Sequence, residues 1–211
     1  MAEISSYEKQ AAVLFPIGLV IEGSGGIKVA GTEMQLDASH CGVVEVTFVD
    51  KDKKFVQARS VVLLPPCALT IPVTQTGELV LVRVLRPGAR TFHWEFPQER
   101  AFPDKDPNEE AIRCAREEVG LISEDPVVLP LGINPWSRLD RLTEETRCRV
   151  VIGSYDLSER KDKAEMTEGN VRMFSVDEAV GLVASGEMTC CANIAALLWF
   201  DRNRGQFGLN P

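Results

Sequence analysis

The sequence WEFPQERAFPDKDPNEEAIRCAREEVGL occupies residues 94–121 and joins a proline-containing loop to a well-delimited helix. The helix has a side-chain cap before its first turn, a proline at its first position, a glutamate at its third and a glycine after its last turn. The residues that supply these signals are Asp106, Pro107, Glu109 and Gly120, with Asp106 and Glu109 in a capping-box arrangement. The pattern predicts a helix over residues 107–119.

Side chains four residues apart on this helix stack on one face. Arg113 is therefore expected beside Glu117, and Cys114 beside Glu118. Adjacent carboxylates on a helix that borders a cleft can converge on a divalent cation, and Mg²⁺ prefers oxygen ligands. The plainer alternative is a solvated ion pair near a helix end.

Composition limits the classes of function. The chain has 211 residues, of which 45% are hydrophobic, so it can bury a sizeable core. It has 31 acidic and 23 basic residues, a net charge of −8, which disfavours nucleic acid as a main partner. An acidic protein that binds anionic small molecules needs local Arg or Lys side chains, or divalent cations, to offset its own charge.

Targeting signals and metal motifs are not evident in the sequence. The N-terminus lacks the basic, apolar and small-residue pattern of a signal peptide, and no apolar run approaches the roughly 20 residues of a membrane span. The six cysteines are widely spaced, without a C-x-x-C pair. We therefore expect reduced, buried thiols in a cytoplasmic protein, without a structural zinc site and without membrane contact.

The remaining elements are expected to form a mixture of strands and helices. Alternating residues over 43–64 predict a hairpin, and a glycine-rich turn within 17–27 predicts a short strand pair, so residues 1–60 are expected to form a β-rich lobe. Residues 61–211 are expected to form a second domain of the α/β or α+β class. Its expected strands are 69–73, 79–85, 127–131 and 148–157, and its other expected helices are 176–184 and about 189–204.

The helix and its preceding loop resemble the Nudix hydrolases, whose motif is G-x5-E-x7-R-E-U-x-E-E-x-G-U, with U an aliphatic residue. The match is in register and without a gap, and it is anchored at Arg113, Glu117, Glu118, Gly120 and Leu121. The resemblance implies an α/β/α sandwich with a mixed sheet.

Further segments are similar to the ADP-ribose pyrophosphatase branch of that family. They are the L-V-R-x-x-R strand at residues 81–86, the W-E-x-P segment at 94–97 and the tail over 176–198. The resemblance implies a nucleoside diphosphate linked to another moiety as the ligand, with ADP-ribose or a nucleotide sugar as examples. It also implies a homodimer that forms through the β-rich lobe.

Three positions depart from the motif. Glu99 replaces its first glycine, Lys105 replaces its first glutamate, and Cys114 replaces the glutamate after Arg113. A thiol is a soft ligand that suits Mg²⁺ poorly, so Mg²⁺ or Mn²⁺ is expected to bind weakly and hydrolysis is expected to be weak or lost. The simplest structural role for Cys114 is a buried side chain that fills the volume of the missing carboxylate.

The resemblance also assigns roles in catalysis and metal binding. Glu117 and Glu118 would be metal ligands, together with the backbone carbonyl of Gln98, and Arg113 would orient Glu117. A glutamate in a late loop would be the general base, and the sequence does not choose between the two candidates. These candidates are Glu165 and Glu168.

The resemblance also implies residues that bind the substrate. Arg83 and Arg86 would meet its diphosphate, since guanidinium groups match phosphate oxygens, and Glu95 would also contact it.

Two alternatives stay open. One is a working hydrolase in which Glu95, Glu99 or Glu110 replaces the missing carboxylate; Glu110 lies four residues before Cys114 on the same helix face. The other is a non-catalytic dimeric scaffold or regulatory module.

Overall fold

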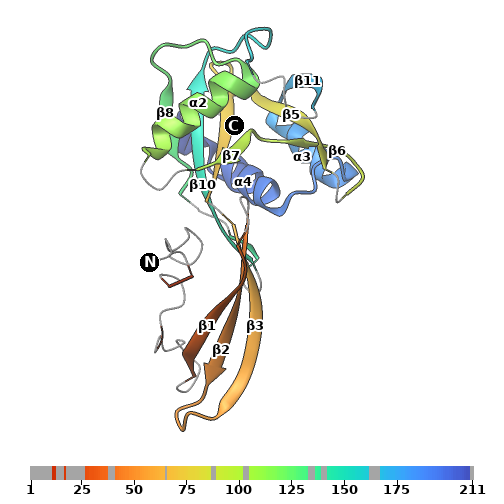
Figure 1. Ribbon diagram of the computed structural model, residues 1–211. Coiled ribbons are helices and arrows are strands. Elements are labelled where there is room, and N and C mark those ends of the chain that lie inside the picture. Colours follow the sequence, from red (N-terminus) through yellow and green to blue (C-terminus); the bar gives the residue numbers. More distant parts are fainter. Residues whose placement is uncertain are drawn as a thin grey trace. The chain divides into compact units, whose positions relative to one another are not determined.

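The computed structural model describes residues 11–12, 17, 27–37, 41–64, 66–86, 89–101, 105–132, 136–138, 142–161 and 167–209, which are coloured in Figure 1. The chain divides into two compact units: Met1–Pro65 with Trp136–Glu144, and Pro66–Pro135 with Glu145–Pro211. The boundary predicted near residue 60 lies close to the end of the first segment, whereas the return of residues 136–144 to the first unit has no counterpart in the sequence prediction.

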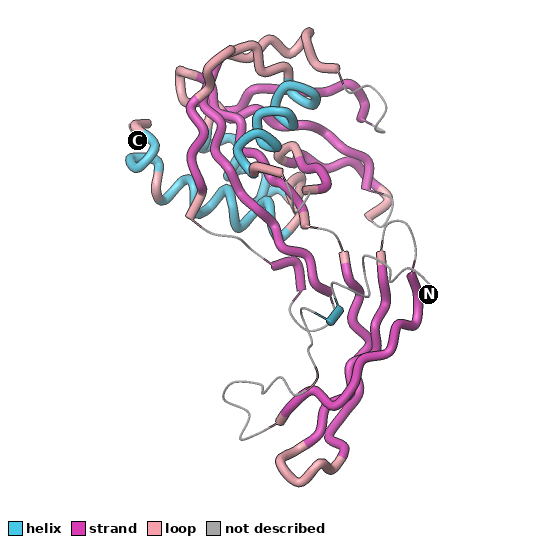
Figure 2. The backbone as a smooth tube through the Cα atoms, turned by 60° about the vertical axis from the view of Figure 1, so that its left-hand side comes forward, coloured by secondary structure: helices cyan, strands magenta, loops and turns pink. Residues whose placement is uncertain are grey.

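The first unit contains an antiparallel sheet of β1 (Lys28–Asp37), β2 (Gly42–Val49) and β3 (Phe55–Leu63), visible in Figure 2. The hairpin predicted over residues 43–64 is confirmed by the pairing of β2 with β3. The carboxylate of Asp50 closes its turn by accepting the backbone N–H groups of Asp52 and Lys54. The strand pair predicted within 17–27 falls almost wholly outside the described residues.

A small core lies on one face of this sheet. Alternate residues of a strand point to opposite faces, so one set of apolar residues is buried while its neighbours are partly exposed. The buried residues are Ala11, Val29, Val44, Val46, Val61 and Leu63.

The second unit is built on a mixed sheet. Its central order is β10-β4-β5-β11, in which β10 and β4 are parallel and the other neighbours are antiparallel. Additional strands pair with this path: β6 with β5, β7 with β4, and β8 and β9 with β10. The strands of this path and those paired with it are β4 (Cys67–Thr74), β5 (Leu79–Arg86), β6 (Thr91–Glu95), β7 (Gln98–Arg100), β8 (Val127–Pro130), β9 (Trp136–Arg138), β10 (Leu142–Gly153) and β11 (Thr167–Phe174). Of these, β9 and the start of β10, as far as Glu144, belong to the first unit.

Helices cover both faces of the sheet. α2 (Pro107–Val119) lies on one face, and α3 (Val176–Ser185) and α4 (Cys191–Arg202) lie on the other (Figure 1). A 3₁₀ helix, η1 (Arg204–Phe207), follows α4. The predicted α/β class with a mixed sheet and the three predicted helices are therefore confirmed. Among the described residues, no helix is both long enough and apolar enough to cross a bilayer.

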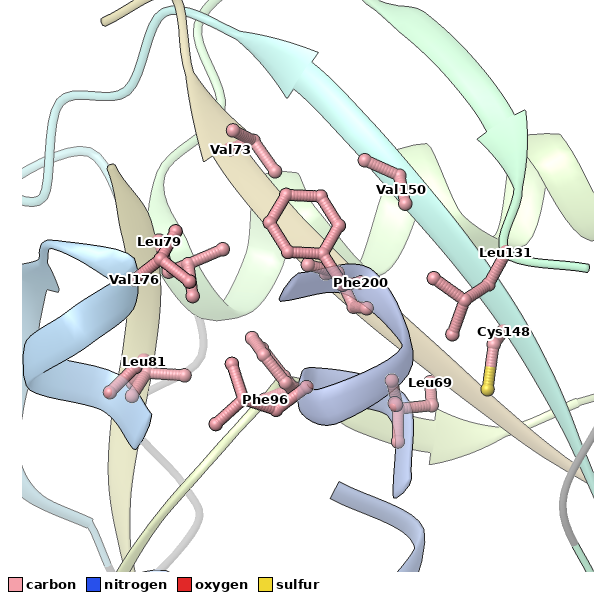
Figure 3. Packing of buried hydrophobic residues seen from close by; sticks show 14 of the residues in the cluster. Leu69, Val73, Leu79, Leu81, Phe96, Leu131, Cys148, Val150, Val176 and Phe200 are labelled. Atoms are coloured by element: carbon pink, nitrogen blue, oxygen red, sulfur yellow. The ribbon is translucent and has the colours of Figure 1, made fainter. Parts of the chain in front are cut away.

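The alternation of side chains in the strands builds two cores, one under each layer of helices. On one face, buried residues of β4, β5 and β10 surround Phe200 of α4 (Figure 3). On the other face, residues of β5 and β10 pack on the apolar side of α2. This second set comprises Val80, Val82, Val84 and Val151 from the sheet, Ala111, Ala115 and Val119 from the helix, and Leu121 just after the helix.

Some local expectations need correction. β10 begins at residue 142 rather than 148, and it ends at residue 153 rather than 157. The carboxylate of Asp106 accepts the N–H groups of Asn108 and Glu109, but the reciprocal bond of a complete capping box is found in α3 instead, between Ser175 and Glu178. All six cysteines are free thiols, yet only two of them are buried, and Cys191 is exposed.

Candidate functional site

The end of α2 is fixed by a close contact with the segment after β10. Gly120 has φ 73° and ψ 42°, and a Cβ atom placed on it would lie 2.0 Å from the carbonyl oxygen of Asp156. The backbone N–H of Asp156 donates to the Gly120 carbonyl at 2.9 Å, and the N–H of Lys161 donates to the Glu117 carbonyl at 2.9 Å. Only glycine fits both the left-handed conformation and this approach. The contact therefore holds the helix turn that carries Glu117 and Glu118.

Cys114 is fully buried beneath this turn, which confirms the expectation of a buried side chain. Its Sγ atom lies 3.6 Å from Glu118 Oε1, a distance at which the thiol donates to the carboxylate. Burial, reinforced by the negative charges of Glu118 and Glu99, raises the pKa of Cys114 well above its usual value. The group is therefore a neutral thiol rather than an anionic ligand.

Arg113 joins two carboxylates. Its Nη2 atom lies 2.7 Å from Glu99 Oε1, and its Nη1 atom donates to Glu117 Oε2 at 3.2 Å. Burial raises the pKa of Glu99 from 4.5 to about 7; Arg113 opposes this shift, and Glu117 and Glu110 add to it. The predicted contact between Arg113 and Glu117 is present, and Glu99 joins it at the motif position where the family has glycine.

The loop before Glu99 is held from two directions. The carbonyl of Pro97 accepts the N–H of Thr70 on β4, at 3.0 Å, and the N–H of Phe96 donates to Asn193 Oδ1 on α4, at 2.6 Å. Gln98 pairs with Leu69, so its backbone belongs to the sheet. Asn193 is completely buried and was not identified from the sequence, although an amide among the apolar residues at the start of α4 was a visible signal.

The two predicted diphosphate ligands do not lie together. In β5, Val82 and Val84 face α2, so Arg86 continues that face and Arg83 points to the opposite one. The guanidinium of Arg83 lies over the ring of Phe92, 5.5 Å from its centroid. Arg86 instead donates to both oxygens of Glu95, with Nε 2.8 Å from Oε1. The prediction that Arg83 and Arg86 both meet the diphosphate of the substrate therefore stays a prediction, and the two side chains would have to reach it from opposite faces of β5.

Two shallow hollows lie on the described part of the surface around α2. One, of about 380 Å³, is lined by the outward side of the helix, including Arg113 and Glu117, and by Lys161. The other, of about 260 Å³, is lined by Lys105, Arg113, Glu109 and Glu110. Lys105 itself is exposed.

The two candidates for a general base are Glu165, which precedes β11 in the sequence, and Glu168, which belongs to β11. Glu165 lies outside the described residues. The backbone of Glu168 forms part of β11, and its side chain is outside the described part of the chain.

The described side chains of this site offer a Mg²⁺ ion only part of a ligand set. Within the described ranges, no three His, Cys, Asp or Glu side chains gather as a metal ion requires. Glu118 contacts the neutral thiol of Cys114, and Glu117 contacts Arg113. Cys114 itself offers a soft sulfur atom where Mg²⁺ prefers oxygen.

The arrangement of a mixed sheet between α2 and the α3–α4 pair defines a Nudix-like fold. No family model and no curated protein matches the sequence. Among solved structures, the crystal structure of an ADP compounds hydrolase is similar, with a TM-score of 0.67 and 17% sequence identity. The likeness covers 86% of this chain and 96% of that chain, and it shows the fold.

Proposed function

We propose that this protein binds a nucleoside diphosphate linked to another moiety, of the ADP-ribose or nucleotide-sugar class, and that its hydrolytic activity is weak or lost. The observation that carries the proposal is the buried, neutral thiol of Cys114 beside Glu118. The printed name of the similar structure, an ADP compounds hydrolase, supports the ligand class.

The loss of one carboxylate weakens catalysis without abolishing binding. Removal of a single electrostatic stabiliser of a transition state typically costs about 2.7–4 kcal/mol, or about 100- to 1,000-fold in rate. Ligand binding depends on groups other than the missing carboxylate. One of them is Arg86, which lies on the α2 face of the sheet. Mg²⁺ or Mn²⁺ is expected to bind weakly at Glu117, Glu118 and the Gln98 carbonyl, where hard oxygen ligands remain.

The test compares ADP-ribose binding and hydrolysis, with Mg²⁺, in the natural protein and in Cys114→Glu. Calorimetry is expected to detect ADP-ribose binding to both proteins, and hydrolysis is expected to rise about 100-fold or more in Cys114→Glu. Cys114→Gln, which has a similar volume and no charge, is the matched control and is expected to gain nothing. Absence of binding at millimolar ADP-ribose would refute the proposed ligand class.

A working hydrolase is the second candidate, and the position of Glu99 favours it. This carboxylate lies on β7, contacts Arg113, and interacts electrostatically with Glu117 and Glu110, so it reaches the side of α2 where an oxygen ligand is missing. If Glu99 replaces the missing group, the natural protein hydrolyses ADP-ribose, and both Glu99→Gln and the double replacement of Glu117 and Glu118 by Gln abolish turnover.

The quaternary structure is a separate part of the proposal. By its resemblance to the ADP-ribose pyrophosphatase branch, the chain is proposed to form a homodimer through its first unit. Light scattering tests this, and a monomer would also argue against the scaffold alternative, which depends on the dimer surface.

A further inference from the structure

We infer that Glu95 is a positioning residue that orients Arg86 toward the diphosphate of the ligand, and that Arg86 alone, rather than Arg86 together with Arg83, binds that diphosphate from the α2 face. This inference rests on the proposed function. It assigns to Glu95 a role through Arg86 instead of direct contact with the ligand.

The register of the strands places both residues on the same face. Val82 is opposite Glu95 in the β5–β6 pair, and residues opposite each other point to the same side of a sheet. Val82 packs against α2, so Glu95 also faces α2. Arg86 lies four residues after Val82, an even number, and therefore shares this face. Arg83, at an odd distance, faces α3 and α4.

The exposure of the pair is asymmetric. The Glu95 side chain is 2% exposed, whereas the Arg86 side chain is 47% exposed. A buried carboxylate that gives both oxygens to one guanidinium is held by that contact and is poorly placed to meet a second group. Arg86 is the member of the pair that a ligand reaches.

The geometry of the contact explains how one residue orients the other. A guanidinium is planar and carries five N–H donors in a fixed fork. Glu95 accepts from Nε and Nη2, and these two contacts fix the plane of the whole group. The direction of Nη1 is then set by Glu95, on the face of the sheet that carries α2 with Glu117 and Glu118. A fixed fork matches phosphate oxygens with little loss of side-chain entropy.

Calorimetry with ADP-ribose and with adenosine tests the inference, because only ADP-ribose has phosphates. Glu95→Gln keeps the size of the side chain but weakens its hold on Arg86, and we expect about a 10- to 100-fold loss of ADP-ribose affinity, the usual value of a hydrogen bond to a charged group. The affinity for adenosine is expected to stay within about twofold. Arg86→Gln is expected to have the same selective effect.

A double-mutant cycle separates positioning from general structural support. If Glu95 acts only through Arg86, adding Glu95→Gln to Arg86→Gln causes no further loss. Arg172→Gln is the matched control: it removes an arginine that also pairs with a glutamate, Glu178, at 3.6 Å, and it is expected to leave both affinities unchanged. If Glu95→Gln fails to fold, Arg86→Lys, which keeps the charge but not the fork, is expected to show the same selective loss.

Four outcomes would overturn the inference. The orientation of Arg86 would not be needed if Glu95→Gln, or Arg86→Lys where that variant is used, bound ADP-ribose with an affinity within about twofold of that of the natural protein. Equal losses for ADP-ribose and adenosine, or additive losses in the cycle, would show a structural role. A natural protein that binds no ADP-ribose would overturn the proposed function, and with it this inference.

Discussion

Replacement of Gly120 by alanine tests the close contact at the end of α2. Alanine would have to adopt φ 73°, which costs about 1–2 kcal/mol for a residue with a Cβ atom. Its Cβ would also lie 2.0 Å from the carbonyl oxygen of Asp156, so the backbone there must move. The movement weakens two hydrogen bonds, each worth about 0.5–1.5 kcal/mol: Asp156 N–H to Gly120, and Lys161 N–H to Glu117. The total loss of unfolding free energy is about 2–5 kcal/mol.

Gly186 provides a matched control. It ends α3 with φ 78°, and no atom lies within 4 Å of a Cβ placed on it. Gly186→Ala therefore carries only the conformational cost, about 1–2 kcal/mol. Both glycines lie in the second unit, so the same unfolding transition reports on both variants.

Urea and thermal unfolding, followed by circular dichroism, measure the difference between the two variants. An additional loss of about 2 kcal/mol in Gly120→Ala corresponds to a melting temperature about 4–8 °C below that of Gly186→Ala. Equal losses in the two variants would refute the argument that the contact with Asp156, rather than the left-handed conformation alone, requires glycine at this position.

Three further predictions concern stability. The raised pKa of Glu99 means that the folded protein keeps a proton that the unfolded chain has released, so stability falls as the pH rises from 4.5 to about 7. In Glu99→Gln, urea titrations at several pH values should show a fall smaller by about 1–2 kcal/mol, a figure that allows for solvent screening and for Arg113. An unchanged fall would contradict the assignment of this pH dependence to Glu99. Ser175→Ala removes the N-cap of α3 and should cost about 0.5–2 kcal/mol in urea unfolding, with no loss arguing against the cap. Asn193→Ala leaves the buried N–H of Phe96 without its acceptor and should cost about 1–3 kcal/mol in the same assay, whereas a neutral change would show that another acceptor replaces it.

The sequence predicted α2 to the residue because the signals that delimit it are local. A cap at Asp106, a proline at the first position and a glycine after the last turn act within a few residues of the helix ends. Cys114 was predicted to be buried because a free thiol behaves as a small hydrophobe, and it is indeed buried in α2 together with Ala111 and Ala115. Features of this kind need no knowledge of the rest of the fold.

The faces of the arginines could also have been read from the sequence. Residues 83 and 86 are three apart, and a strand alternates with a period of two, so they could not share a face without an irregularity between them. The pattern L-V-R-x-x-R treats Arg83 and Arg86 as one pair because of their spacing in the chain. It does not indicate that their side chains point to opposite faces of a strand.

Other parts of the site depend on long-range contacts. The partner of Arg86 follows from the register of β5 with β6, which no local pattern fixes. The side-chain amide of Asn193 accepts the N–H of Phe96, 97 residues earlier in the chain. The sequence shows a polar residue at position 193, but it does not show which backbone group that residue binds. The strand β11 was missed because residues 167–170 are mostly polar and follow a charged segment.

The composition of the first unit affects how the protein is made. Leu142 and Thr143 of β10 pair with Val62 and Leu63 of β3, and Trp136–Glu144 belongs to this unit although Met1–Pro65 is synthesised much earlier. At about 5–20 residues per second, the ribosome needs about 4–14 s to pass from residue 65 to residue 136. During this interval the end of β3 is an edge strand that lacks its later neighbour, the kind of edge at which nascent chains associate. Slower synthesis of the intervening segment should therefore increase aggregation of the nascent protein, even though the finished chain would be identical.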